Sequence, residues 1–544
     1  MTGSAQLPVG DAEDLPPVDP SRFVYTDGQL LRTPDGREFL FKGIAFGNSV
    51  WSNPADPDDF THHRMDAYAD VRSMGFNSVR FYINYGLFED DDNPYSYKES
   101  GFEWLDRNIV AAKEQGIYLI VNMHYPQGGF QSNGNGDALW TDGNNRKRLA
   151  ALWQEIALRY RNEPQIAGYG LVNEPVPADS PDQWKDLAQE LIQKIRSVDE
   201  HHLLFVERSI WEKNGTTDEV RRNLHFPKGL TDPAGKLVYE FHMYDPMAFS
   251  HQNASWTKWK GSCAVYPDLS RAEMKNRRWA GFSRMNPLGE TGTYDWKPYE
   301  GESFKVEDPS FLMGFPVVHA NGIGASGRIW ADDIRIEEFD GSGKSLGIIW
   351  TSSADEDYGW SFWAADGRGS FSLDNVGRSN GKSLCIEGTK SDANITAGEF
   401  GFRVSLGHSY KISGFLKGRK ISPTAKVSLR IDFYSGDSVN GWDIDYLDSC
   451  LKEFVELGRE WNVPLYLGEF GLIRYAYENG RGGDKWLSDM LTLLNRYRIS
   501  YNYHTYHEDA FGLYANNTGF PDPAAENAAA VRLFKDLQLP ARGE

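Results

Sequence analysis

The sequence predicts an α/β fold, namely a (β/α)8 TIM barrel with an all-β jelly-roll or sandwich domain inserted after strand 6. Three observations support this prediction. Short apolar runs alternate with helical patterns up to about residue 265, at the spacing of βαβ units. Residues 266–440 then lose helical periodicity and become rich in Gly, Ser, Asp and short β segments, as in a sandwich. The alternating pattern returns at residue 441.

These changes divide the chain into three parts. Residues 1–21 are rich in proline and acidic residues and are expected to be a flexible leader. The barrel is expected to comprise residues 22–265 together with 441–544, and residues 266–440 are expected to form the inserted β domain. Its segments DDIRI, KSLCIEG and YKISGFLKG resemble those of carbohydrate-binding jelly-roll modules. A chain of 544 residues exceeds what a single hydrophobic core usually holds, so a barrel plus one further module is a natural partition.

The first part of the barrel is expected to open with a hairpin and to supply six strands. Asp-Gly pairs at Asp27 and Asp35 separate short β-like runs in residues 22–43, a pattern typical of a hairpin that plugs the bottom of a barrel. The strands are expected at residues 39–46, 77–84, 117–125, 166–176, 203–210 and 237–244. The helices are expected at residues 64–74, 102–115, 146–161 and 181–197, and the first two are closed by Gly75 and Gly116.

The second part completes the barrel after the inserted domain. A helix is expected at 442–462, strand 7 at 465–471, a further helix at 485–498 and strand 8 at 499–508.

Two glutamates stand at the ends of predicted strands. Glu174 ends the apolar run of strand 4, and Glu469 ends that of strand 7. Pro175 disfavours the α region for the residue before it, so we expect Glu174 in extended backbone. In a β/α barrel the chemistry lies at the carboxyl ends of the strands, and a pair of carboxylates there is typical of glycosidic bond hydrolysis.

Other polar residues stand at the remaining strand ends. They are Arg80, His124, Asn173, His242, Tyr244 and His504. An arginine beside one carboxylate would keep it ionised, while a less solvated partner could keep its proton. Each residue alone is more often structural, because a single histidine or arginine in a core usually has a local partner. Their occurrence at successive strand ends makes coincidence improbable.

Composition and charge exclude several functions. The net charge is −20 and the pI about 5.1, which argues against nucleic acid or an anionic membrane as a partner. No apolar run of 18 residues exists, and three distant cysteines show neither metal-ligand spacing nor a disulfide framework. We expect a monomer that takes a neutral polysaccharide or oligosaccharide and needs no metal or organic cofactor. A polymer substrate would require secretion, although residues 1–21 lack a signal-peptide pattern.

The barrel segments resemble glycoside hydrolase family 5, the cellulase family of retaining (β/α)8 enzymes. The matching segments are VRF around Arg80, NMHYPQGG around His124, LVNEP around Glu174, EFHMYDP around His242 and Tyr244, and LGEFG around Glu469. The resemblance implies that Glu174 is the acid/base and Glu469 the nucleophile. It also implies that Asn173 contacts the sugar 2-hydroxyl, that Arg80 and Tyr244 support Glu469, and that His124 and His242 line the −1 subsite.

The end of strand 8 departs from this family. Many members carry a tryptophan platform there, whereas this chain has YNYHTYHE, which puts His504 or a neighbouring tyrosine in its place. The sugar preference therefore stays open. The leading function is an endo-β-1,4-glucanase. A β-mannanase, a β-1,3-glucanase, an exo-acting β-glucosidase, a transglycosylase and a non-catalytic carbohydrate-binding scaffold are the alternatives.

Tryptophans of the inserted domain have two interpretations. Trp330, Trp350, Trp360 and Trp363 would either stack on sugar or fill the core of the domain.

Overall fold

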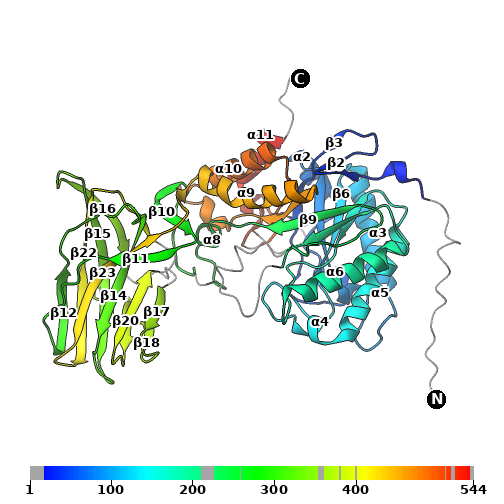
Figure 1. Cartoon of the computed structure of the whole chain (residues 1–544). Helices are drawn as coiled ribbons and strands as arrows, with labels where there is room; N and C mark the ends of the chain where they lie inside the picture. The colour runs from blue at the N-terminus through cyan, green and yellow to red at the C-terminus, as the bar shows by residue number, and fades with distance from the viewer. Residues whose placement is uncertain are drawn as a thin grey trace, which may run out of the picture. The chain divides into compact units, whose positions relative to one another are not determined.

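The computed structural model describes residues 18–209, 226–257, 259–352, 360–378, 381–397, 401–508, 510–515 and 521–538. The chain divides into two compact units (Figure 1). One comprises Met1–Tyr244, Cys450–Tyr477 and Leu487–Glu544, and the other comprises Asp245–Ser449 and Glu478–Trp486. The predicted leader lies outside the described residues except for residues 18–21.

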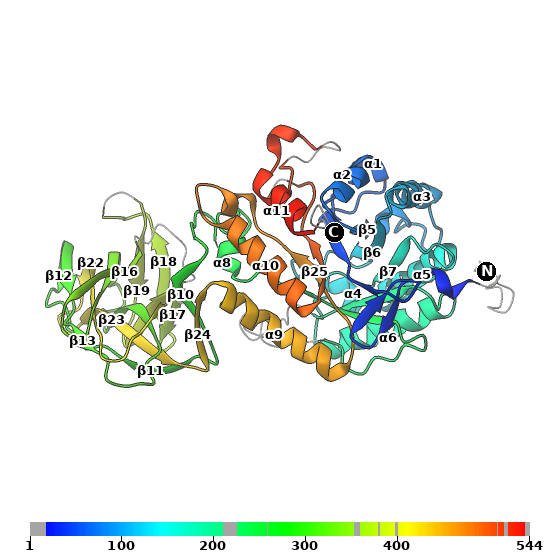
Figure 2. The same cartoon turned by 90° about the horizontal axis from the view of Figure 1, so that it is seen from above.

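The first unit contains a closed barrel of eight parallel strands, as predicted (Figures 1 and 2). In chain order these are β4 (Lys42–Phe46), β5 (Ser78–Asn84), β6 (Tyr118–Tyr125), β7 (Ile166–Gly170), β8 (Leu203–Glu207), β9 (Leu237–His242), β25 (Leu465–Phe470) and β26 (Ser500–Tyr503). Each strand pairs in parallel with its neighbours, and β26 closes the barrel on β4. The chain enters the β domain after β9, so the predicted insertion after strand 6 is confirmed.

Helices surround the barrel in the order that the sequence predicts. The longer ones are α2 (Ala67–Ser73), α3 (Glu99–Glu114), α5 (Gly143–Tyr160), α6 (Pro181–Arg196), α9 (Ile444–Trp461), α10 (Gly483–Tyr497) and α11 (Ala528–Gln538). Short ones in the same unit are α1 (Pro57–Phe60) and α4 (Asp137–Thr141), and α8 (Met247–Ser250) belongs to the second unit; α11 and the short helices were not predicted. In α6, Trp184, Leu187, Leu191 and Ile195 recur every three or four residues and are all buried, which is the pattern of a helix packed on one face. None of the described helices is long and apolar enough to span a membrane.

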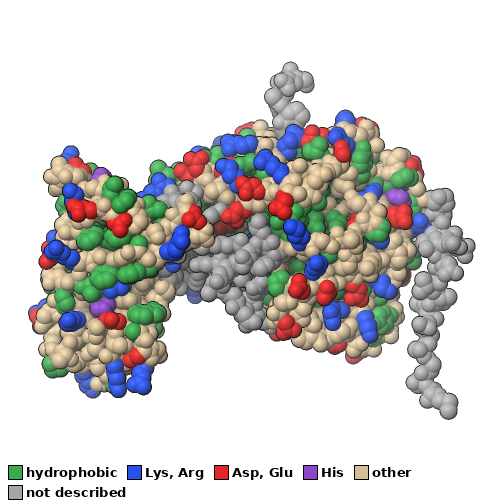
Figure 3. Space-filling view, in the orientation of Figure 1, with side chains coloured by type: hydrophobic (Ala, Val, Ile, Leu, Met, Phe, Trp, Pro, Cys, Tyr) green, Lys and Arg blue, Asp and Glu red, His purple; other side chains and the backbone are tan. Residues whose placement is uncertain are grey.

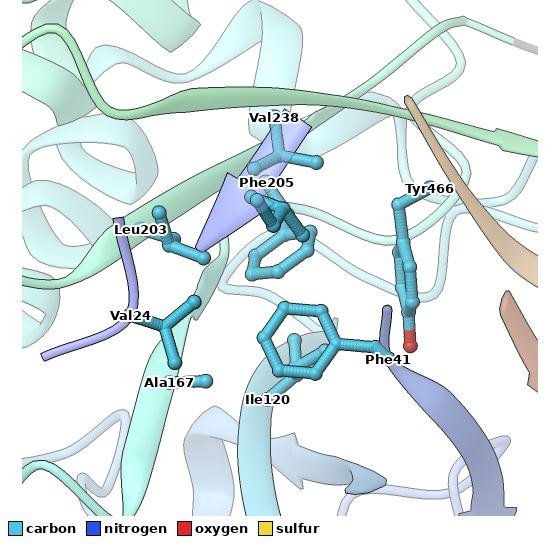
Figure 4. Close-up of a cluster of buried hydrophobic side chains, with 9 residues drawn as sticks. Val24, Phe41, Ile120, Ala167, Leu203, Phe205, Val238 and Tyr466 are labelled. Atoms are coloured by element: carbon cyan, nitrogen blue, oxygen red, sulfur yellow. The ribbon is translucent and has the colours of Figure 1, made fainter. Parts of the chain in front are cut away.

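The N-terminal end of the barrel is closed by a small antiparallel sheet, so the predicted hairpin is confirmed. It consists of β1 (Tyr25–Asp27), β2 (Leu30–Arg32) and β3 (Glu38–Phe39). Val24 and Leu31 from this segment pack in one buried cluster with side chains from the first residues of the barrel strands (Figure 4). The cluster contains Val24, Leu31, Phe41, Ile120, Ala167, Leu203, Phe205, Val238 and Tyr466. Apolar side chains fill this end of the barrel, and the polar strand residues lie at the opposite, carboxyl end.

The second unit is all-β apart from short helical segments, as predicted. One sheet has the order β11-β23-β14-β20-β17, with β21 beside β14, and the other has the order β12-β22-β15-β19-β18, with β13 and β16 at its margins. The first sheet contains β11 (Arg278–Phe282), β14 (Met313–Asn321), β17 (Trp360–Ala364), β20 (Asp392–Ala397), β21 (Phe402–Arg403) and β23 (Lys426–Ser435). The second contains β12 (Gly292–Glu300), β13 (Phe304–Lys305), β15 (Arg328–Phe339), β16 (Ser345–Ser352), β18 (Ser370–Asp374), β19 (Ser383–Glu387) and β22 (Ser409–Ile421). A two-stranded ribbon consists of β10 (Asp268–Lys275) and β24 (Ser438–Trp442).

Candidate active site

Glu469 lies near the end of β25 and is held by two donors from β5 and one from the segment after β9. Arg80 donates from Nη1 to its Oε1 at 2.8 Å, and the Tyr82 hydroxyl donates to the same oxygen at 3.1 Å. The Tyr244 hydroxyl donates to Oε2 at 2.8 Å. The side chain is only 7% exposed, so these contacts replace most of its hydration.

Positive neighbours determine the charge of Glu469. Burial alone would raise the pKa of this carboxyl, but His242, His504 and Arg80 lower it well below its usual range. The carboxylate is therefore ionised over a wide pH range, which suits a nucleophile.

Glu174 lies in the loop that follows β7, four residues beyond the last strand residue. The expectation of extended backbone is wrong, because its φ is 45°, in the left-handed region. The preference that Pro175 imposes is a local bias, and a tertiary contact outweighs it here: the Glu174 N–H donates to Oε2 of Glu207 at 2.9 Å. The carboxyl is 18% exposed and can be reached by solvent or substrate.

His242 joins the two glutamates. Its Nδ1 lies 3.0 Å from Oε1 of Glu174 and 3.5 Å from Oε2 of Glu469. These distances from one atom put the two carboxylate oxygens within about 6.5 Å of each other, which favours the shorter spacing of retaining enzymes over that of inverting enzymes. Burial opposes a charged imidazole, yet Glu207 and Glu469 raise the pKa of His242 well above its usual range.

The other predicted residues lie in the same network. Asn173 accepts from Nη2 of Arg80 at 2.9 Å and donates to the Ser132 hydroxyl at 3.2 Å. His124 packs against the Tyr82 ring with centroids 4.1 Å apart, and burial lowers its pKa well below the usual value. The structure thus brings all eight predicted site residues together at the carboxyl end of the barrel.

The end of strand 8 presents a histidine to this network. His504 Nδ1 lies 3.1 Å from the Tyr82 hydroxyl, and its Nε2 lies 3.3 Å from Oε2 of Glu508. Tyr503 is turned to the other side of β26, where its hydroxyl meets that of Tyr477 at 3.0 Å. Of the two readings that the sequence left open, His504 rather than the neighbouring tyrosine occupies the site. Phe511, which the sequence analysis did not include, lies 5.7 Å from the His504 ring.

Three further residues of the site were missed. Tyr82, Glu207 and Glu240 are all buried and point into the barrel end. Alternation along a strand could have found two of them, since Tyr82 is two residues beyond Arg80 and Glu240 two residues before His242. Glu207 is the last residue of β8, and Glu469 is the last but one of β25. A glutamate at a strand end was therefore the sequence pattern that could have revealed Glu207.

These acids surround Arg80 and His242. Glu240 Oε1 lies 2.8 Å from Nη2 of Arg80, and Glu207 Oε1 lies 3.4 Å from Nε2 of His242. Burial raises the pKa of Glu207 well above its usual range; His242 opposes this shift and Glu240 adds to it. Among the described residues, Glu174, Glu207 and His242 also form a group whose ligand atoms lie within 4.8 Å of one another, a spacing that a metal ion could use.

Comparison with known families gives one match. Residues 33–294 match the family model described as cellulase, glycosyl hydrolase family 5.

Curated relatives match the chain in part. Endoglucanase C of Acetivibrio thermocellus is 32% identical over 189 residues, covering 35% of this chain and 52% of the relative. A beta-xylosidase of Phanerodontia chrysosporium is 36% identical over 247 residues, covering 42% of this chain and 48% of the relative. Cellodextrinase A of Ruminococcus flavefaciens is 26% identical over 225 residues, covering 40% of this chain and 62% of the relative. The chain therefore spans about half the length of the first two relatives and somewhat more of the third.

Solved structures resemble the chain at low identity. Cel5A of Thermotoga maritima in complex with cellobiose is 16% identical, with a TM-score of 0.46, over 90% of this chain and 96% of that chain. The structure of the endoglucanase Cel5A from the same organism gives 15% identity and a TM-score of 0.47 over the same shares.

Proposed function

Because the barrel of this chain belongs to glycosyl hydrolase family 5, we propose that the protein is a retaining glycoside hydrolase that cleaves a β-1,4-linked glucan at internal bonds. The observation that carries this proposal is the pair Glu174 and Glu469 in opposite settings. Glu469 has three donors and a lowered pKa, whereas Glu174 is partly exposed and has one imidazole contact. A nucleophile and an acid need this difference.

The proposed mechanism is double displacement. Glu469 attacks the anomeric carbon while Glu174 gives its proton to the leaving oxygen, which produces a glycosyl enzyme. Glu174 then takes a proton from water, and the resulting hydroxide equivalent releases the sugar with retained configuration. Arg80, Tyr82 and Tyr244 keep Glu469 oriented throughout, because their hydrogen bonds come from rigid barrel positions.

The remaining site residues are assigned to the sugar. Asn173 would contact the 2-hydroxyl of the sugar at the cleaved bond, and His124 and His242 would line the same subsite. His504 and Phe511 would form the wall where many family members carry tryptophan. Neither a metal nor an organic cofactor is required for this chemistry.

An exo-acting β-glycosidase is the second candidate. Two relatives are named beta-xylosidase and cellodextrinase rather than endoglucanase, and one of them has the highest identity of the three. The unusual wall at His504 favours a different sugar or a shorter binding site. The same two glutamates would serve either activity, since loops rather than carboxylates choose the substrate.

Hydrolysis of soluble β-glucans, mannans, xylans and aryl β-glycosides by the wild type and Glu469→Ala tests the proposal. Mixed-length oligomers from a β-1,4-glucan, absent with the variant, would support the endo activity. Release of single sugars only from chain ends would favour the exo candidate. Binding of a polymer without any cleavage by the wild type would contradict both and leave the non-catalytic scaffold. Cleavage at full rate by a folded Glu469→Ala would refute the assigned nucleophile.

We further propose that the β domain, residues 266–440, contacts the polymer. Trp330, Trp350 and Trp360 are at most 8% exposed and belong to the core, so the core interpretation holds for these three. Trp363 is 56% and Trp279 54% exposed, and both can stack on sugar. A polymer too large to enter a cell would have to be met outside it, and we therefore propose that the protein is secreted.

A further inference from the structure

A buried carboxylate outside the predicted pair contacts the proposed acid/base directly at the backbone and indirectly through His242. Glu207 accepts the backbone N–H of Glu174 through Oε2 at 2.9 Å. Its Oε1 lies 3.4 Å from Nε2 of His242, and Nδ1 of the same ring lies 3.0 Å from the Glu174 carboxyl. Glu207 is thus linked to Glu174 at the backbone and, through His242, at the side chain.

The backbone link acts on an unfavourable conformation. Glu174 has φ 45°, a region that residues with a β-carbon adopt only where the surroundings fix it. Pro175 favours extended backbone for the same residue. Without the acceptor on Glu207, the N–H of Glu174 would lose its buried partner and the residue would relax toward the extended form. That movement would carry the acid away from the glycosidic oxygen.

The side-chain link requires a proton. Oε1 of Glu207 and Nε2 of His242 are both buried, and neither has a hydrogen-bond partner of good geometry in the described part of the chain. A protonated Glu207 can donate to Nε2, or an imidazole that carries a proton on Nε2 can donate to Oε1, and in either arrangement one proton lies between the two atoms. The other charged groups around this pair are Glu174, Arg80, which lies 3.7 Å from Glu207, and Glu240, whose Oε1 lies 3.6 Å from Nε2 of His242.

We propose that Glu207 is a positioning residue for the acid/base: it fixes the left-handed backbone of Glu174 and holds the imidazole that orients the Glu174 carboxyl. This inference rests on the proposed function, because it gives Glu174 the acid/base role. It predicts that Glu207 affects the two steps in which Glu174 transfers a proton, and kcat/KM reports the first of them, the delivery of a proton to the leaving group.

Leaving-group dependence measures that step. The wild type, Glu207→Leu and Glu207→Gln would be compared on 2,4-dinitrophenyl and phenyl β-glycosides of the sugar that the wild type cleaves. Dinitrophenolate leaves without a proton, whereas phenolate needs one. For Glu207→Leu we expect kcat/KM to fall on the order of 10²-fold with the phenyl glycoside and less than about threefold with the dinitrophenyl glycoside. Glu207→Gln keeps an acceptor for the N–H and a donor for Nε2, so it should restore most of the phenyl rate.

Asp199→Asn is the matched control. Asp199 is also a buried acid that binds a histidine, His202, and a tyrosine, Tyr169, but it lies in the turn before β8 at the other end of the barrel. Its substitution should leave the ratio of the two rates at the wild-type value even if the protein becomes less stable.

Several results would overturn the inference. A parallel loss on both glycosides would assign Glu207 a structural role alone, and an unchanged Glu207→Leu would assign it none. Loss of wild-type activity on EDTA treatment, restored by zinc, would assign Glu174, Glu207 and His242 to a cation instead. If the wild type cleaves no glycoside and no polymer, the proposed function itself is refuted. This outcome differs from failure of the Glu207 inference, because it is seen with the wild type alone.

Discussion

Glu469 keeps its charge in a buried position because cations from several strands converge on it. His242, His504 and Arg80 all lower its pKa, and of these His504 stands where the sequence departs from the family. Burial lowers the pKa of His504, but Glu469 and Glu508 raise it above the usual value, which favours the charged imidazole beside the Glu469 carboxylate. The residue at this position therefore affects the electrostatics of the nucleophile as well as the shape of the sugar site.

A pH profile of His504→Gln tests this electrostatic role. A nucleophile must be ionised, and a lowered pKa keeps it ionised as the pH falls, so the wild-type acid limb of kcat/KM should lie below pH 4.5, the ordinary value for Glu. Removal of the His504 charge should move that limb to higher pH. The profile is measured with an aryl glycoside. A limb that stays in place, or moves to lower pH, would show that His504 does not act on Glu469.

The candidate site residues could be predicted from the sequence because they are polar residues at the ends of apolar strand segments. All eight candidate residues lie in one network, because parallel strands bring their carboxyl ends to one edge. The backbone of Glu174 was not predictable, since its left-handed φ depends on Glu207, 33 residues away in sequence. The preference of a residue before proline is local and could not reveal that contact.

The predicted barrel strands and helices are present with shifted ends, whereas α11 and the short helices were not predicted. Strand 4 was expected to reach residue 176, yet β7 ends at Gly170, because the residues after it turn to place Glu174. Within β7, Gly168 and Gly170 are needed for close approach rather than for turning. A β-carbon at Gly168 would lie 2.3 Å from the backbone oxygen of Leu203 in β8.

Gly168→Ala should therefore destabilise the barrel. The new methyl group meets backbone that cannot swing aside, so β7 and β8 must separate, and we expect a loss of about 1–3 kcal/mol in the free energy of unfolding. Gly143→Ala is the control, because Gly143 begins α5 and its β-carbon would meet nothing within 4 Å. That variant should be neutral or gain up to about 1 kcal/mol. Denaturant unfolding measures both, and equal effects would contradict the argument.

The presence of a barrel and an inserted β region followed from composition, whereas the use of the inserted region did not. Loss of helical period after β9 indicated an all-β unit, and its return indicated the rest of the barrel. Which tryptophans face outward depends on strand pairing that the sequence does not show. Trp330, Trp350 and Trp360 are buried, while Trp363 and Trp279, the latter not singled out, are exposed.

The two exposed tryptophans lie on one face of one sheet. Trp279 pairs with Tyr434 and through it with Met313, whereas Trp363 pairs with Asn394 and through it with His319. Met313 and His319 are six residues apart in β14, so all these side chains share a face. Figure 3 shows hydrophobic side chains among polar and charged ones over this sheet, which faces the viewer in Figure 1.

The distance between the two tryptophans on this face suits an extended polysaccharide. Trp279 lies on β11 and Trp363 on β17, the two edge strands, and the four steps between them span about 19 Å. Between them Arg430 and Asp432 lie on the same face and pair with each other at 2.7 Å. Aromatic rings at both ends and polar atoms between them favour a neutral sugar polymer over an anionic ligand.

Trp279→Ala and Trp363→Ala, singly and together, should weaken retention of the protein on the polymer that it cleaves. Each exposed ring removed should raise the dissociation constant several-fold, since a stacked ring contributes on the order of 1 kcal/mol. Hydrolysis of a small aryl glycoside should stay at the wild-type rate, because the site residues in the barrel are unchanged. Ile348→Ala removes an equally exposed apolar group, 54% exposed, from the other sheet and should retain full binding. Equal retention of all four variants would refute a glycan-binding role for this face, and a loss shared by Ile348→Ala would indicate non-specific adsorption.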